Sequence, residues 1–179
     1  MNSGQLLMTV GALILLGTTI LTVNKNNLNQ GAILRQTEIG MYAVGLATSY
    51  FEKASNLSFD EFTAQGNLAL ATTDLSATLG IDNNGREVAK KDTSFNDFDD
   101  YNGFDTTVSA SQVDDFHVII SISYITNASP YSTKTATPSW LKQMDVAIIP
   151  TVGRQAIMGG NTKAGTDTIK MSYIYSLYQ

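Results

Sequence analysis

The stretch that decides the fold is residues 6–23, which read LLMTVGALILLGTTILTV and contain no charged side chain. Eighteen such residues lie at the lower end of what spans a bilayer as a helix. A cleaved secretory signal would need a basic N-terminal region and a shorter apolar core, but residues 1–5 contain no Lys or Arg. The pattern therefore predicts an apolar N-terminal helix, with a simple signal anchor as the plain alternative.

This helix is expected to continue well past the apolar stretch. No proline occurs before Pro130, and no obvious breaker occurs before Ser55. A helix of some 55 residues would be on the order of 80 Å long, and a domain of this size has no interior that covers it on all sides. We expect residues 1–26 to form an apolar helix, residues 27–57 its amphipathic continuation, and residues 58–179 a globular head.

The continuation carries two apolar stripes where an ordinary surface helix has one. One stripe lies within about 40° of Ile39 around the helix and contains Ile39, Ala43, Leu46 and Tyr50. The nearly opposite stripe contains Leu34, Met41, Val44 and Phe51. Two stripes require two burial partners, which we expect to be the head and another copy of the chain. The alternative is a helix that runs through the middle of a larger core.

Composition excludes several classes of function. The chain of 179 residues has a net charge of −5 and scattered basic residues, so no nucleic-acid partner is expected. Cysteine is absent, which excludes disulfides and thiolate chemistry. The only histidine is His117, so a catalytic triad or a histidine-rich metal site is hard to build. No phosphate loop, dinucleotide signature or serine nucleophile elbow occurs, and we expect a protein that is not an enzyme.

The remainder of the chain predicts an antiparallel sheet. Three segments have strand patterns: Phe116 to Tyr124, Met144 to Ile149, and Ile169 to Leu177. The alternation in the first places His117 on its polar face, as an exposed residue and not a catalytic base. Loops are predicted for residues 82–85, 127–139 and 153–167. The predicted fold class is α+β, with a long N-terminal helix packed on a C-terminal antiparallel sheet.

One acidic cluster is a candidate metal site. Its oxygen-bearing residues are Asp97, Asp99, Asp100, Asn102 and Asp105. Hard oxygen ligands at this density suit Ca²⁺, although the spacing is not that of an EF-hand. The other interpretation is a solvated turn rich in Asp and Asn, which we favour. We therefore expect no cofactor, with a bound Ca²⁺ at this cluster as the alternative. A pair of carboxylates for glycoside hydrolysis is not expected, because neighbours on a turn do not face one another across a cleft.

An uncharged first half-helix, an amphipathic second half and a β-rich remainder together resemble mature type IV pilins and pseudopilins. The resemblance implies that Met1 follows a leader removed by prepilin peptidase and is methylated. It also implies insertion in the inner membrane, then extraction by an assembly machinery into an extracellular filament. The partners would be other copies of the chain, joined through residues such as Ala12 and Ile14. Residues 99–103, Asp-Asp-Tyr-Asn-Gly, resemble a segment of some pilin heads, including minor subunits of mannose-sensitive haemagglutinin-type pili.

One position departs from the family pattern. The family usually has Glu at the fifth mature position, where it neutralises a neighbour's N-terminal amine, and this chain has Gln5. The resemblance also implies a segment that unwinds locally on assembly, which we place at Gly17, Thr18 and Thr19. Three related functions stay open beside a main filament subunit. They are a minor pilin, a secretion-system pseudopilin, and a single-span membrane-anchored extracytoplasmic binding module.

Overall fold

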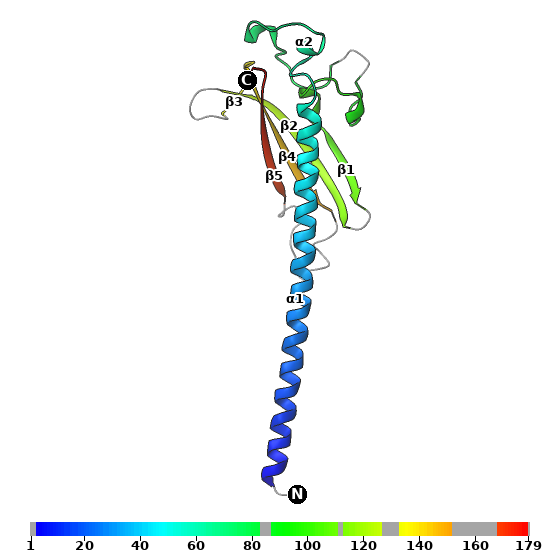
Figure 1. The fold of residues 1–179 in the computed structure, drawn as a ribbon, viewed down its shortest axis with the longest axis vertical. Coiled ribbons are helices and arrows are strands. Elements are labelled where there is room, and N and C mark those ends of the chain that lie inside the picture. The colour runs from blue at the N-terminus through cyan, green and yellow to red at the C-terminus, as the bar shows by residue number, and fades with distance from the viewer. Residues whose placement is uncertain (1–2, 83–86, 111–112, 127–132, 152–167, 179) are drawn as a thin grey trace. The chain divides into compact units, whose positions relative to one another are not determined.

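The structure is a computed structural model that describes residues 3–82, 87–110, 113–126, 133–151 and 168–178. In this part of the chain one long helix comes first, followed by a short helix, three 3-10 turns and five strands (Figure 1). The fold class is α+β, with a long N-terminal helix and a C-terminal antiparallel sheet, as the sequence predicts. Of the predicted loops, residues 83–85, 127–132 and 153–167 lie outside the described residues.

Helix α1 (Ser3–Ser55) is continuous, as expected from the absence of proline and strong breakers. Its last turn contains Lys53. A positive charge is favourable there, because the helix dipole places partial negative charge at the C-terminal end of a helix. The chain forms two compact units, Met1–Glu38 and Ile39–Gln179, called here the N-terminal unit and the head. The expected division at residues 26 and 57 followed composition, whereas compact units follow packing, so the head includes the last part of α1.

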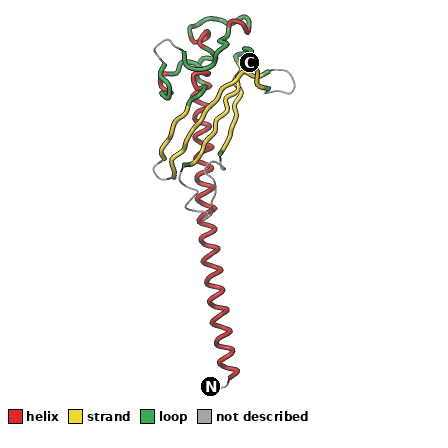
Figure 2. Tube along the Cα trace, turned by 180° about the vertical axis from the view of Figure 1, so that it is seen from behind, coloured by secondary structure: helices red, strands yellow, loops and turns green. Residues whose placement is uncertain are grey.

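The strands that the structure describes in the head all pair antiparallel. The strands are β1 (Asp105–Ala110), β2 (Asp114–Ile125), β3 (Lys134–Thr135), β4 (Leu141–Pro150) and β5 (Ile169–Ser176). The spatial order is β1-β2-β4-β5, and the short β3 pairs with the end of β2 (Figure 2). In the central pair, Ile120 lies opposite Val146 and Tyr124 lies opposite Lys142. This register decides which side chains share the inner face of the sheet.

The core of the head lies between this inner face and residues 39–55 of α1. The alternation predicted for β2 is confirmed, because Phe116, Val118, Ile120, Ile122 and Tyr124 are all buried. The helix contributes the buried residues Ile39, Ala43, Ala47, Tyr50, Phe51 and Ala54. Three of these six are alanines, whose small side chains allow the helix backbone to approach the sheet.

Phe51 corrects the predicted outer stripe of the helix. We expected it opposite Ile39, facing away from the head, but it is buried and its ring stacks on Tyr173 with centroids 5.5 Å apart. The buried stripe centres near Ala47 and is wide enough to include Phe51, which lies about 120° from Ile39 around the helix. Met41 and Val44 remain exposed, as expected of the outer stripe.

The structure contains elements that the sequence pattern did not indicate. β1 is an edge strand of mostly polar residues, so no apolar alternation marks it. β3 lies within the predicted loop 127–139 and has only two residues. The segment left without an assignment, residues 56–80, contains α2 (Glu61–Ala64) and a 3-10 turn at Thr72–Asp74. Asp60 caps α2, because its side chain accepts a hydrogen bond from the Phe62 amide.

Candidate functional site

The first candidate site is the surface of the N-terminal unit. Large apolar side chains are exposed along its whole length: Leu6, Leu7, Met8, Val10, Leu13, Ile14, Leu15, Leu16, Ile20, Leu21, Val23, Leu28, Ile33 and Leu34. Helix α1 is long and apolar enough to cross a membrane, judged by length and composition alone. None of its most apolar window is buried, whereas the core helix of a soluble protein would be mostly buried. A signal sequence would pass the same test.

The threonine hydroxyls of residues 6–23 are satisfied within the helix. The Thr9 hydroxyl donates to the Leu6 carbonyl at 2.9 Å, and the Thr19 hydroxyl donates to the Leu15 carbonyl at 2.8 Å. Thr18 and Thr22 make the same kind of bond to carbonyls three or four residues earlier. A hydroxyl bonded to its own backbone costs little to transfer into an apolar environment. The helix surface is therefore suited to lipid or to other apolar helices.

The residues expected to act in processing and assembly fall as follows. Met1 lies outside the described residues. Gln5, Ala12 and Ile14 are exposed on α1, and a Cβ added at Gly17 would meet nothing within 4 Å. The helix is continuous through Gly17 and the two threonines that follow. Local unwinding on assembly stays a prediction.

A second exposed surface belongs to the helical part of the head. Met41 is 66% exposed and Val44 is 44% exposed, although both lie on a helix whose other side is packed on the sheet. Tyr42 lies between the two faces and stacks on Phe116, with ring centroids 5.1 Å apart. The helical part of the head therefore has one apolar face packed on the sheet and a second apolar face that is exposed.

The second candidate site is the acidic cluster, and the structure separates its predicted members. Asp99 is engaged by Lys142, while Asp100 Oδ2 accepts hydrogen bonds from the Asn96 and Asp97 amides. Both ends of the Asn102 amide are used, since Nδ2 donates to the Leu79 carbonyl and Oδ1 accepts from the Ile122 amide. These bonds are those of an ordered turn.

Asp105 lies apart from the cluster on β1 and contacts the chain's histidine. Its Oδ1 is 2.6 Å from His117 Nε2, across the β1–β2 pair. Both side chains are partly exposed, the histidine by one third and the aspartate by about one half. His117 was expected to be exposed on the polar face of its strand, and it is half-buried there in a cross-strand pair.

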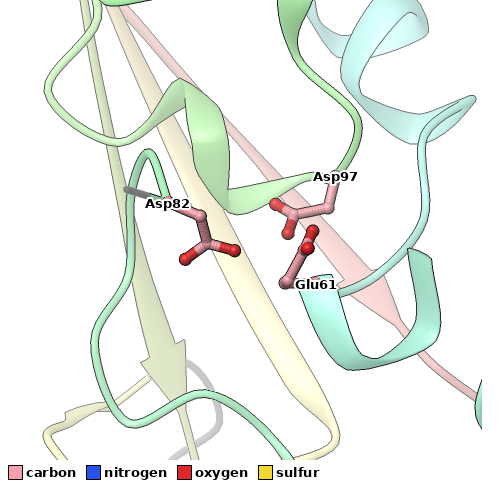
Figure 3. A group of neighbouring side chains, drawn as sticks. All are labelled: Glu61, Asp82 and Asp97. Atoms are coloured by element: carbon pink, nitrogen blue, oxygen red, sulfur yellow. The ribbon is translucent and has the colours of Figure 1, made fainter. Parts of the chain in front are cut away.

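A different trio of carboxylates comes together instead. One oxygen each from Glu61, Asp82 and Asp97 lies within 4.8 Å of the others. Figure 3 shows these three carboxylates gathered from three separate segments of the chain. Only Asp97 belongs to the predicted set, because sequence spacing does not reveal that α2 and the segment before residue 83 approach it. Carboxylate oxygens suit Ca²⁺, and calcium binding stays a prediction.

The electrostatics of this region reflect a surplus of buried acid. Burial raises the pKa of Asp97 to about 9, assisted by the neighbouring charges of Asp99 and Asp100. Burial likewise raises the pKa of Asp100 to about 6, against the hydrogen bonds from two backbone amides. Asp97 Oδ1 accepts hydrogen bonds from the amides of Asp99 and Asp100, which hold the side chain in place. The turn therefore positions acids that are protonated more readily than free aspartate.

The buried lysine of β4, Lys142, is the centre of this region. Its ammonium donates to the Phe59 carbonyl at 2.6 Å and to Asp60 Oδ2 at 3.0 Å, and it contacts Asp99 Oδ1. It also lies over the rings of Phe59 and Tyr124, 4.5 Å and 5.2 Å from their centroids. Lys142 is fully buried and ties the loops around α2 to the sheet.

Asp60 has the opposite electrostatics from Asp97. Burial alone would raise its pKa, but the charge and hydrogen bond of Lys142 hold the pKa below its usual range. Hydrogen bonds from the Phe62 amide and from Ser76 act in the same direction. The Tyr124 hydroxyl adds a further bond to Asp60 Oδ2 at 3.2 Å. Asp60 is therefore the ionised partner of Lys142.

Sequence reasoning missed Lys142 and Asp60, although one signal for the lysine was present. Inner-face residues of β4 alternate through Met144, Val146 and Ile148. Extending this period of two backward by one step places Lys142 on the same buried face. The predicted strand began at Met144, because lysine is rarely a buried residue.

Comparison of the chain with models of known protein families, with curated proteins and with solved structures finds no match.

Proposed function

We propose that this chain is the structural subunit of an extracellular type IV pilus-like filament that polymerises through its N-terminal helix. The observation that carries the proposal is the extent of exposed apolar surface on α1. It does not end at Val23, where a bilayer span would be complete, but resumes after the polar stretch 24–27 at Leu28, Ile33 and Leu34. A simple membrane anchor has no use for this second part.

Burial in a bundle of identical helices accounts for both parts of the surface. The first part is uncharged and has its hydroxyls bonded internally, so it tolerates lipid before assembly and helix contacts afterwards. The open face of the head, which contains Met41 and Val44, supplies a further apolar contact for neighbouring copies. The sheet and the loops would then face away from the bundle and carry whatever specificity the filament has.

The test is a charge placed in the helix. Ala12→Asp and Ile14→Asp each introduce an unpaired carboxylate into a surface that must be desolvated on assembly, and we expect surface fibres to fall at least tenfold. The matched control is Asn56→Asp, at an exposed polar position just after the helix. Sheared fibres are measured by electron microscopy and immunoblotting. Unchanged fibre amounts in both helix variants would contradict the proposal.

A second readout separates the filament subunit from a single-span anchored binding module. For the subunit, mass spectrometry of the native protein is expected to show a methylated Met1 after leader removal. For the anchored module, the protein is expected to remain a detergent-solubilised monomer with an unprocessed start. A minor pilin or a pseudopilin would share the methylated start and differ from a main subunit in its abundance in the fibre.

A further inference from the structure

The buried ammonium of Lys142 is held against two carboxylates in an apolar enclosure. Both Asp60 and Asp99 contact its Nζ, and the rings of Phe59 and Tyr124 lie above it. The lysine side chain and that of Asp60 are fully buried, and that of Asp99 is nearly so. Among the described residues Lys142 is the one buried cation, against buried carboxylates at Asp60, Glu87, Asp97, Asp99 and Asp100.

An ordinary buried ion pair is a weak explanation for this arrangement. Removing a lysine and two aspartates from water costs several kcal/mol per ion, and the attraction between them repays this only in part. The same groups could lose both charges by forming a covalent bond. An amide between a lysine amine and an aspartate side chain is neutral, and it would leave a single carboxylate in the enclosure.

We propose that Lys142 and Asp99 condense into an intramolecular isopeptide bond, with Asp60 as the group that accepts the proton from the lysine. The bond would join β4 to the turn at Asp99–Tyr101. No sequence motif or expected function requires it, and it does not depend on filament assembly.

The reaction balances without any other reactant. Asp60 takes a proton from the Lys142 ammonium, and the free amine attacks Cγ of Asp99. The new Nζ–Cγ bond forms as the bond from Cγ to one oxygen breaks, and this oxygen leaves as water after receiving the transferred proton and the one released by the attacking nitrogen. In sum, one ammonium and one carboxylate become one amide and one water, and nothing is oxidised or reduced.

The fold supplies what this condensation lacks in free solution. Amine and carboxyl are fixed in contact by β4 and by the Asp99–Tyr101 turn, which replaces a bimolecular encounter by an intramolecular one. The carboxyl is held from its other side, because the Gly80 amide donates to Asp99 Oδ2 at 3.3 Å. This donor is placed to stabilise negative charge that develops on the oxygen during attack. Exclusion of water protects the product from hydrolysis.

Asp99 is the acceptor of the amine and Asp60 is the base, because their surroundings differ. Asp60 also accepts hydrogen bonds from the Ser76 amide and hydroxyl and from the Tyr124 hydroxyl, which stabilise it as a carboxylate. Within the part of the chain that the structure describes, the Asp99 side chain accepts from the Gly80 amide and from the lysine. Attack on a carboxylate stabilised by several donors would lose all of their charge-assisted bonds at once.

The test is mass spectrometry of the full-length protein, purified in detergent and digested with trypsin after denaturation. The amide blocks cleavage at Lys142, so we expect residues 92–134 and 135–154 to appear as one joined species. Its mass is expected to be lower than the sum of the two peptides by one water molecule. Separate peptides at full mass from the folded protein would overturn the proposal. A joined species with residues 54–86, which contain Asp60, would overturn the assignment to Asp99.

Variants locate the reacting groups. Asp99→Ala and Lys142→Met are expected to abolish the joined species, and Asp60→Asn is expected to reduce it at least tenfold while circular dichroism shows a folded protein. The matched control is Lys134→Arg, which removes an amine that pairs with Asp145 at 2.7 Å but is 55% exposed, and which keeps the tryptic site after residue 134. The joined species should persist in that variant. Persistence in Asp60→Asn at the wild-type level would exclude the proposed base.

Discussion

At the scale of single residues, the head contains buried aspartates whose surroundings shift their pKa values in opposite directions. The Asp97 side chain accepts hydrogen bonds from two backbone amides, but burial and two neighbouring aspartates raise its pKa. Asp60 sits a few ångströms from a cation and is held ionised by it. Two aspartates of one loop region thus have opposite protonation preferences, because hydrogen-bond donors and charges are distributed unequally around them.

The pKa of Asp97 leads to a pH-dependence prediction. The folded protein keeps this proton up to a pH of about 9, whereas the unfolded chain loses it near a pH of about 4. Unfolding therefore releases a proton between these values, and the free energy of unfolding falls as the pH rises through them. Asp97→Asn keeps an oxygen for both backbone amides and removes the titration. We expect its stability at pH 8 to exceed that of the wild type by on the order of 1–2 kcal/mol.

Denaturant unfolding of both proteins across this pH range, in buffer with a chelator, measures the effect. Asp145→Asn is the control. Burial would raise the pKa of Asp145, but hydrogen bonds from Lys134 and Ser172 lower it, so folded and unfolded states are both ionised above a pH of about 5. That variant should keep the wild-type slope at neutral and alkaline pH. A slope that is unchanged in Asp97→Asn would contradict the assignment of the raised pKa to this residue.

What the sequence could predict at this scale depends on how local the signal is. The turn at residues 96–103 was recognisable from its Asp and Asn content, because such side chains bond to amides a few residues away. The pairing of Lys142 with Asp60 and Asp99 was not, because it joins positions 82 and 43 residues apart. The one signal in the sequence is the alternation through Met144, Val146 and Ile148, which places Lys142 on the same face when it is extended backward.

At the scale of elements, α1 and the sheet illustrate the same distinction. The length of α1 and the faces of β2 follow from periods within one segment, and both were predicted correctly. The polar edge strand β1 follows from pairing with β2, in which Val108 lies opposite Phe116, and no pattern within its six residues marks it. The position of Phe51 was wrong because the width of the buried stripe depends on the sheet that covers it.

The closeness of α1 to the sheet leads to a prediction about Ala47. This residue is fully buried where the helix packs on the sheet. Close-packed protein interiors leave little space for a longer side chain. Ala47→Leu is expected to lower the free energy of unfolding by about 1–3 kcal/mol through overpacking. Gly45→Ala is the control on the same helix, because a Cβ added there meets nothing within 4 Å. It should stabilise the protein by about 0.5–1 kcal/mol.

Both variants are compared with the wild type by thermal unfolding of the full-length protein in detergent, followed by circular dichroism. The opposite signs of the two effects are the informative result, since a general change in helix content would move both in one direction. A leucine tolerated at position 47 without loss of stability would mean that the helix does not pack closely on the sheet.

At the scale of the whole molecule, the two faces of α1 in the head have different roles under the proposed function. The inner face contains Phe51, which is 8% exposed, and it stabilises the head of each copy. The outer face contains Met41, which is 66% exposed, and contributes to contacts between copies. Sequence periodicity placed both residues on one outer stripe, so the structure changes which of them should affect assembly.

The two faces can be separated by experiment. Met41→Asp replaces a side chain that is 66% exposed, so its free energy of unfolding should stay within about 0.5 kcal/mol of the wild type. Its surface fibres should nevertheless fall several-fold, because the carboxylate must be desolvated between copies. Phe51→Ala should lose about 3–5 kcal/mol by leaving a cavity against Tyr173, and protein that remains folded should still assemble. Unfolding measurements and fibre yields on the same two variants decide between these roles. Normal fibres from Met41→Asp would confine the assembly surface to the N-terminal unit.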